Sequence, residues 1–448
     1  MNFTTTEQAN LEQKGLTLQA HAEVGGQISD SHWIPLVESE QLLIDLMSGD
    51  PPAPDAPGHI ELSWVLYTLN HDLPPNLQWL VDVLRRLGMP PSRIQPADWQ
   101  KWMTQLAGAG VLYGDGTLLA VAPYAQLDPG WLLSAIDYFI LKNVHWPIGL
   151  HPFANKPKRL QLTQPTSLKI AVLGDCGTGP YQDGNLANSP SQLVFDQIKS
   201  LSPDIIIHLG DVYYSGTAAE ETKKLVNCWP TAGLGNFTMN SNHEMYDGAN
   251  GLFKTALGSP AFGDQQKTTY FSVEWGDWLI VGLDSAYYDP SSFFMTGALT
   301  DPAQKAFLQQ AMATGKKVIL MTHHCGMNVT GSATTPLWQN VSDALGGHMP
   351  AYWYWGHEHN GIVYGPGAAC GDKIECRCLG NAAIPIGNSS WLQAANKSAV
   401  RFYTDAPLDQ PTPPQALRVK NGFALLELSH SGLTETWYYQ DGTQAWQS

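Results

Sequence analysis

Gly356-His357-Glu358-His359-Asn360 places two histidines one residue apart, directly after the apolar run Tyr352-Trp353-Tyr354-Trp355. Alternate side chains of a strand share one face. A turn at the end of the strand, which Gly356 permits, can direct both imidazoles into one pocket. A His-x-His pair alone is weak evidence for a metal site, but four other polar clusters precede this one along the chain.

The first two polar clusters each end a run that is typical of a buried strand. Residues 168–173 lead into Gly174-Asp175, and residues 204–209 lead into Gly210-Asp211. Helical material at about 191–200 separates the two runs. This order predicts parallel pairing, with the functional loops at the carboxyl ends of the strands.

The other two clusters contain amide and imidazole groups. One is Ser241-Asn242-His243-Glu244, and the other is His323-His324 at the end of the run 317–322. Asp284, which follows the run 278–283, is expected to orient a ligand histidine or to cap a loop. The second cluster continues with Tyr213-Tyr214, which adds a phenol group. Carboxylate, phenolate, amide oxygen and imidazole together suit iron, zinc or manganese.

Composition narrows the classes of partner. The chain has 448 residues, of which 14% are charged, and its formal net charge is −16. This charge argues against a nucleic-acid groove or an anionic membrane surface as the main partner. An anionic substrate would need a local positive centre such as metal ions. The sequence shows no apolar run of about 18 residues and no secretion signal, which favours a cytoplasmic location. The oligomeric state stays open.

The first third of the chain has a different pattern. Helical spacing of apolar residues occurs at 36–47, 77–87 and 99–106, a hairpin is predicted at 111–122, and a helix at 131–144. Residues 151–166 are the best linker candidate. The sequence therefore predicts a mainly helical domain of unknown role over 1–158 and a catalytic domain over 159–448.

The six cysteines are too sparse for a disulfide scaffold in a chain of this length. Cys370, Cys376 and Cys378 form a local cluster. We favour a cysteine-containing hairpin over a disulfide or a metal clip, because Cys-x-Cys lacks the spacing of ordinary zinc motifs.

The ordered set of clusters resembles the calcineurin-like metallophosphoesterase superfamily. Its signature is Asp, then Gly-Asp, then Gly-Asn-His-Asp/Glu, then His, then Gly-His-x-His, and the resemblance runs from residue 168 to the C-terminus. It implies an α/β fold, a four-layer α/β/β/α metallophosphoesterase sandwich. The smaller, mainly helical N-terminal domain would pack against it.

Two positions favour one branch of this superfamily. The general family has a histidine two residues after the first aspartate, where this chain has Gly177. Tyr214 lies three residues after Asp211, and this Gly-Asp-x-x-Tyr motif resembles the purple acid phosphatase branch, in which the tyrosine binds ferric iron. Tyr213 would then be a packed aromatic residue.

The resemblance implies two metal ions, Fe(III) and a divalent ion of iron, zinc or manganese. One ion would bind Asp175, Asp211, Tyr214 and His359. The other would bind Asp211, Asn242, His323 and His357, so that Asp211 bridges the pair.

Two further histidines are the candidate catalytic residues. His243 is expected to protonate the leaving oxygen or to stabilise charge on the phosphoryl group, and the alternative is that it only orients Asn242. His324 either reaches the substrate or packs behind His323. Glu358 should point away from the metals.

The implied reaction is hydrolysis of a small phosphoester by in-line attack of metal-bound hydroxide. We favour an acid-phosphatase-like phosphomonoesterase. The alternatives are a phosphodiesterase, a non-catalytic metal-binding or sensing protein, and an N-terminal binding module that the phosphoesterase domain regulates.

The chain departs from the family pattern at three places. Ser241 replaces the glycine of the third motif, and Cys325 stands where the family often has a proline. Plant-type members of the family carry substrate-contacting histidines some ten residues after the position of His323. This chain has no histidine pair there, so the resemblance implies no substrate preference.

Overall fold

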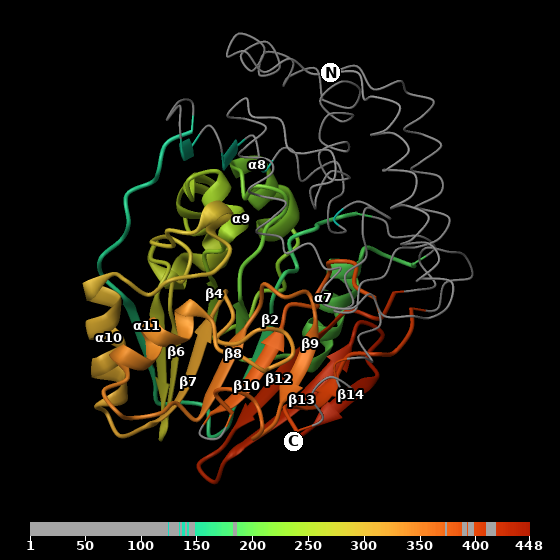
Figure 1. Cartoon of the computed structure of the whole chain (residues 1–448). Coiled ribbons are helices and arrows are strands. Elements are labelled where there is room, and N and C mark those ends of the chain that lie inside the picture. The colour runs from blue at the N-terminus through green and yellow to red at the C-terminus, as the bar shows by residue number, and fades with distance from the viewer. Residues whose placement is uncertain are drawn as a thin grey trace, which may run out of the picture.

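The computed structural model describes residues 148–181, 186–371, 374–387, 398–408 and 418–448, together with Tyr124, Ser134, Asp137, Tyr138, Leu141, Lys142 and Leu392. The elements predicted over 36–47, 77–87 and 99–106 lie outside these residues. So do nearly all of the hairpin at 111–122 and most of the helix at 131–144. The described part has an α/β fold with two sheets (Figure 1).

The larger sheet has eight strands in the order β1-β5-β6-β7-β8-β10-β9-β11. Their bounds are Lys158–Leu162, Phe271–Trp275, Trp278–Gly282, Lys317–Thr322, Tyr352–Trp355, Glu375–Leu379, Gly361–Tyr364 and Val400–Tyr403. Strands β6, β7, β8 and β10 run parallel to one another, while β9 pairs antiparallel with β10. Helices α10 (Pro302–Met312) and α11 (Pro336–Ala344) lie along its outer face (Figure 1).

The smaller sheet has six strands in the order β14-β13-β12-β2-β3-β4. Their bounds are Gln444–Gln447, Leu433–Tyr439, Gly422–Leu428, Leu168–Leu173, Ile205–His208 and Gly235–Thr238. Strands β2, β3 and β4 are parallel, as the sequence predicts for the first two. Helix α7 (Pro190–Leu201) covers the outer face of this sheet.

Short helices fill the loops above the strand ends. They are α8 (Ala218–Glu220), η4 (Glu221–Val226), α9 (Asn242–Tyr246), η5 (Leu252–Ala256), η6 (Pro260–Gln265) and η7 (Ser292–Phe294). Side chains cap the first turns of α7 and α10. The backbone N–H of Gln192 donates to Ser189 Oγ over 3.2 Å, that of Gln304 donates to Asp301 Oδ2 over 2.8 Å, and a proline occupies the first position of each helix.

Apolar side chains on both faces of each sheet define four layers. In β3, Ile205 and Ile207 face the space between the sheets, while Ile206 packs on the side of α7. In β7, Ile319 faces the inner space and Leu320 faces α10. Strands that are buried on both faces have nearly continuous apolar sequences, so these strands could be predicted from the sequence. The predicted α/β/β/α sandwich is confirmed.

Part of the predicted linker belongs to the sandwich. Strand β1 lies within residues 151–166 and pairs in parallel with β5, with Lys158 opposite Phe271. The indole Nε1–H of Trp275 donates to Pro165 O over 2.8 Å and fixes the next turn. The division of the chain at residue 158 stays a prediction. In the described residues, no helix combines the length and apolarity that a membrane span requires.

Candidate metal centre

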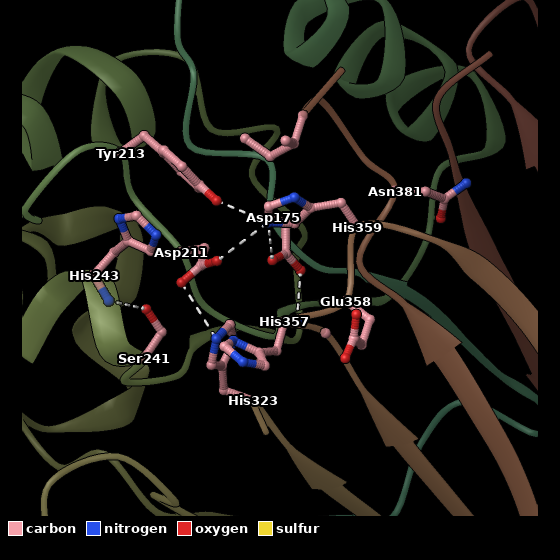
Figure 2. Close-up of polar contacts among 12 residues, drawn as sticks. Asp175, Asp211, Tyr213, Ser241, His243, His323, His357, Glu358, His359 and Asn381 are labelled. Carbon is pink, nitrogen blue, oxygen red and sulfur yellow. Dashed lines mark hydrogen bonds and ion pairs between the residues drawn. The ribbon is translucent and has the colours of Figure 1, made fainter. Parts of the chain in front are cut away.

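Loops from both sheets meet at the carboxyl ends of their central strands (Figure 2). Asp175 and Asp211 follow β2 and β3 of the smaller sheet, and Asn242 is the first residue of α9, beyond β4. His323 follows β7, and the His-x-His pair follows β8, both in the larger sheet. The five polar clusters therefore converge, although 184 positions separate the first from the last (359 − 175).

Asp175, Asp211 and His359 form the first donor group, with one ligand atom from each lying within 4.8 Å of the others. His359 Nε2 lies 3.6 Å from Asp175 Oδ1 and 3.9 Å from Asp211 Oδ2. Both aspartates are buried, and the Oδ1 atom of each accepts no hydrogen bond. Buried carboxylate oxygens without donors are costly unless a cation satisfies them, so this group fits a metal ion.

His323, His324 and His357 form the second donor group, again within 4.8 Å. The Nδ1–H of His323 donates to Leu209 O over 2.9 Å, which leaves a lone pair on Nε2. That atom lies 2.9 Å from Asn242 Oδ1 and 3.3 Å from Asp211 Oδ1. Three acceptors that face one another fit a second cation, and Asp211 contacts both groups.

The protonation states of the histidines favour metal binding. Burial lowers the pKa of His323 to about 3 and, with the neighbouring His324 and His323, holds the pKa of His357 well below its usual value. Neutral imidazoles are the form that coordinates metals. Burial and the charge of Asp211 raise the pKa of Asp175. Burial alone would raise the pKa of Asp211 too, but His323 and His243 lower it well below its usual range.

Three of these residues have left-handed backbone conformations. The φ angles are +59° at Asp175, +79° at Asp211 and +65° at His357. This region costs about 1–2 kcal/mol for an ordinary residue, and less for aspartate. Gly210 has φ +107°, and a Cβ there would lie 3.0 Å from His323 Nδ1. The packed sandwich thus holds its donor loops in conformations that they would not adopt alone.

Helix α9 ties the third cluster to the Asp211 loop. Ser241 caps the helix with φ −135°, so the serine in place of glycine requires no left-handed backbone. Its hydroxyl accepts from the N–H of His243 over 3.0 Å and donates to Glu244. Glu244 Oε1 also accepts from Val212 N over 3.1 Å. Burial, together with the charge of Asp211, raises the pKa of Glu244 to about 8.

The two candidate catalytic histidines differ in their surroundings. The Nδ1–H of His243 donates to Tyr214 O, and burial lowers the pKa of its ring. His324 has both nitrogens engaged: Nε2–H donates to Phe294 O over 2.7 Å, and Nδ1 lies 2.9 Å from Ser285 Oγ. The His324 ring also lies edge-on against His323, with centroids 4.9 Å apart.

Asp284 and Glu358 lie where the sequence predicts. Asp284 Oδ1 accepts from the N–H groups of Ala286 and Tyr287 over 3.0 and 2.9 Å, so it caps a loop. The Glu358 side chain points away from the two aspartates (Figure 2). Neither carboxylate belongs to the donor groups.

The tyrosine pair differs from the sequence prediction. The Tyr213 hydroxyl lies 2.7 Å from His359 Nε2, and its ring stacks on His243 with centroids 3.9 Å apart (Figure 2). Tyr214, the predicted iron ligand, instead stacks on Tyr124 at 4.9 Å and accepts the N–H of Tyr124 on its hydroxyl over 3.2 Å. The Gly-Asp-x-x-Tyr spacing alone does not determine which of two adjacent aromatic side chains points toward the donor groups.

The cysteine cluster packs beneath the His-x-His loop. All six cysteines are free thiols, and Cys370 Sγ lies 3.5 Å from Cys376 Sγ. The Cys378 thiol donates to Glu358 O over 3.2 Å and lies 3.3 Å from Asn360 O. The cluster is therefore the cysteine-containing hairpin of β9 and β10 that the sequence favours.

Comparisons with known proteins relate part of the chain to a known family. The sequence model of the calcineurin-like phosphoesterase family matches residues 168–361. A search of curated proteins gave no match. The chain is similar in structure to a purple acid phosphatase from yellow lupin seeds, with 14% identity, a TM-score of 0.42, and coverage of 66% of this chain and 54% of the plant protein. The match thus spans about half the length of that phosphatase.

Two further solved structures are similar. GAP50, the anchor in the inner membrane complex of Plasmodium, has 12% identity and a TM-score of 0.43, with coverage of 63% of this chain and 88% of that one. Wild-type Vps29 from Entamoeba histolytica, complexed with zinc, has 12% identity and a TM-score of 0.26, with coverage of 63% and 97%. Residues 168–361, which match the model of the calcineurin-like phosphoesterase family, contain every predicted metal ligand.

Proposed function

We propose that this chain hydrolyses small phosphomonoesters at a dinuclear metal centre. The observation that carries the proposal is the position of Asp211, whose Oδ1 lies 3.3 Å from His323 Nε2 and whose Oδ2 lies 3.9 Å from His359 Nε2. One carboxylate that serves two donor groups is the arrangement that a pair of neighbouring cations requires. When bound, such cations polarise a phosphoryl oxygen and activate water at neutral pH.

The donor residues of the proposed centre come from both sheets. Asp175, Asp211 and His359 would hold one ion, while Asn242, His323 and His357 would hold the other with Asp211. Two buried carboxylates supply fewer negative charges than two metal ions supply positive ones. The centre would therefore attract a phosphate group to a chain whose formal net charge is −16.

We assign the proton transfer to the leaving group to His243. Because Nδ1–H donates to Tyr214 O, Nε2 is the ring atom that can hold or release a proton. Stacking on Tyr213 and the hydrogen bond that the His243 N–H donates to Ser241 Oγ fix the orientation of the residue. A positioned acid of this kind contributes typically about 10²–10⁴-fold to a rate.

The test is turnover by the full chain after metal depletion and reloading with iron, zinc or manganese. The substrates are an aryl phosphate monoester and the matching diester, at several pH values. We expect metal-dependent hydrolysis with a preference for the monoester. His323→Ala should abolish it, whereas His348→Ala, at an exposed histidine, should not.

The outcomes separate the alternatives. Turnover of the diester alone would replace the monoesterase assignment with a phosphodiesterase. A preparation that binds metal but hydrolyses neither substrate would indicate a metal-binding or sensing protein. A chain that binds no metal and hydrolyses nothing would refute the proposal.

A further inference from the structure

The hydroxyl of Tyr213 lies against His359, a member of the first donor group. Its Oη atom lies 2.7 Å from Nε2 of His359, the nitrogen that lies 3.6 Å from Asp175 Oδ1. The side chain is fully buried between His243 and His359 (Figure 2). A phenol oxygen in this position is one hydrogen bond away from a nitrogen that would face the metal.

The backbone places Tyr213 beside the Asp175 loop. The Gly177 N–H donates to Asp211 O, and the Tyr213 N–H donates to Gly177 O, both over 3.1 Å. A Cβ at Gly177 would lie 2.3 Å from Asp211 O, so no side chain fits at that position. The two donor loops therefore run in direct contact, and the second of these bonds places Tyr213 beside the Asp175 loop.

A buried ion pair holds the turn that carries Tyr213. Lys224 Nζ lies 3.0 Å from Glu220 Oε1 and donates to the carbonyl of Tyr213. Glu220 accepts from the N–H of Tyr214 and, over 3.0 Å, from the N–H of Ser215. The two side chains are only 11% and 18% exposed, so solvent screens the pair weakly. Three successive backbone groups are thus fixed by two side chains.

Tyr214 makes a different set of contacts. The Lys224 ammonium lies 5.1 Å from the centres of both the Tyr214 ring and the Tyr124 ring, and the two rings stack. A phenol in such a stack contributes packing and a cation–π contact.

We propose that Tyr213 is the tyrosine of the metal centre and that the Glu220–Lys224 ion pair positions it. This inference rests on the proposed metal-dependent function. It assigns the phenol oxygen ligand to Tyr213, one residue before the tyrosine that the Gly-Asp-x-x-Tyr motif specifies. Tyr214 becomes a packing residue, and its carbonyl orients His243.

The test compares Tyr213→Phe with Tyr214→Phe in the full chain. Each substitution removes one hydroxyl, so each is the matched control for the other. The metal-depleted proteins are titrated with Zn²⁺ in competition with a chromogenic chelator, and separately loaded with Fe³⁺ and Zn²⁺ for visible spectroscopy. We expect Tyr213→Phe to weaken Zn²⁺ binding by about tenfold or more and to abolish the tyrosinate-to-iron charge-transfer band. Tyr214→Phe should change neither.

Loss of the band in Tyr214→Phe alone would overturn the assignment and restore the spacing-based one. So would a Tyr213→Phe protein that matches the wild type, or a wild type that binds Fe³⁺ without the band. These outcomes leave the proposed function intact wherever the wild type binds metal and turns over substrate. A wild type that binds no metal would overturn both.

The positioning role has its own test. Lys224→Met keeps the length of the side chain but removes the donor to Tyr213 O, and Lys224→Arg retains a charge. We expect Lys224→Met to weaken Zn²⁺ binding and reduce the band, with partial recovery in Lys224→Arg. The control is Lys199→Met, which breaks the exposed Lys199–Asp196 pair at 3.8 Å. A lower melting temperature of Lys224→Met, with unchanged Zn²⁺ affinity and an unchanged band, would show that the ion pair is only structural. That result would overturn the positioning role of the pair.

Discussion

The Nε2 atom of His323 lies 3.3 Å from the Oδ1 atom of Asp211. The histidine follows β7 of the larger sheet and the aspartate follows β3 of the smaller one, so the contact joins the two halves of the sandwich. The first donor group needs both sheets, because His359 comes from the larger sheet and Asp175 and Asp211 come from the smaller one. The histidines of the second group all come from the larger sheet, and Asp211 of the smaller sheet contacts them. The site exists only where the sheets are packed together.

Asp211→Asn should therefore affect both ions. Asparagine tolerates the left-handed backbone at this position, so the substitution mainly removes the shared charge. We expect kcat/KM to fall by about a thousandfold, since a metal ion supplies several kcal/mol of transition-state stabilisation and each tenfold is about 1.4 kcal/mol. Activity and metal content measured together check this, with exposed Asp196→Asn as the control. Full metal content with full activity would contradict the shared role.

Removal of metal should destabilise the fold. Metal binds only the folded centre, so metal at about a hundred times its dissociation constant adds about 2.7 kcal/mol of stability. We expect a chelator to lower the melting temperature and added metal to restore it. The Asp211→Asn protein should respond much less, which makes it the control. An unchanged wild-type melting temperature would indicate that these acceptors hold no ion.

His243→Ala distinguishes the two roles that the sequence leaves open for this residue. If His243 transfers a proton, kcat should fall by about 10²–10⁴-fold while metal content stays constant. If it only orients Asn242, metal affinity should fall instead. Kinetics with a good and a poor leaving group add a second measurement, because a lost acid slows the poor leaving group more. Equal slowing of both substrates would argue against proton transfer.

Gly380→Ala should disturb the His-x-His loop without removing a donor. A Cβ at Gly380 would lie 2.0 Å from Glu358 O and 2.9 Å from Asp175 Oδ2, so the loop must shift. Overpacking of this kind costs about 1–3 kcal/mol. We expect lower stability in denaturant and weaker metal binding. Gly263→Ala is the control, because its Cβ meets nothing within 4 Å. Similar losses in both variants would mean that the effect is not specific to the loop.

Glu221 should make stability depend on pH. It is fully buried, and neither carboxylate oxygen has a hydrogen-bond partner. Burial, then the charges of Glu244, Glu220 and Asp247, raise its pKa well above the ordinary 4.5. Its contribution to stability is therefore complete below about pH 4.5 and is lost as the pH rises through the higher folded-state pKa.

Glu221→Gln tests this dependence. The amide cannot ionise. The free energy of unfolding of the variant should therefore rise relative to that of the wild type as the pH rises, by up to about 1.4 kcal/mol per pH unit. Denaturant titrations from pH 5 to about pH 8 measure the difference. Glu427→Gln, on the half-exposed face of β12, should show no such trend. A constant difference across the range would show that Glu221 is ionised throughout or that its charge is satisfied.

The strand-end residues could be predicted because each lies next to its strand in the sequence. Asp175 and Asp211 follow doubly buried strands whose apolar runs are unbroken, so the parallel order locates both at one edge. The orientation of Tyr213 could not be predicted in this way, because Lys224, eleven residues further on, fixes its carbonyl. Strand β1 was missed since its alternating pattern, with half-buried and exposed residues, resembles a polar connection.

The left-handed backbone at Asp175, Asp211 and His357 limits how this centre could be redesigned. Glycine, asparagine and aspartate enter that region readily, whereas branched and bulky residues do not. Exchanging these predicted ligands for cysteine or glutamate to suit another element would distort the turns before it altered coordination. Engineering of a new metal preference would have to begin with the main chain of the loops, and only then choose the donors.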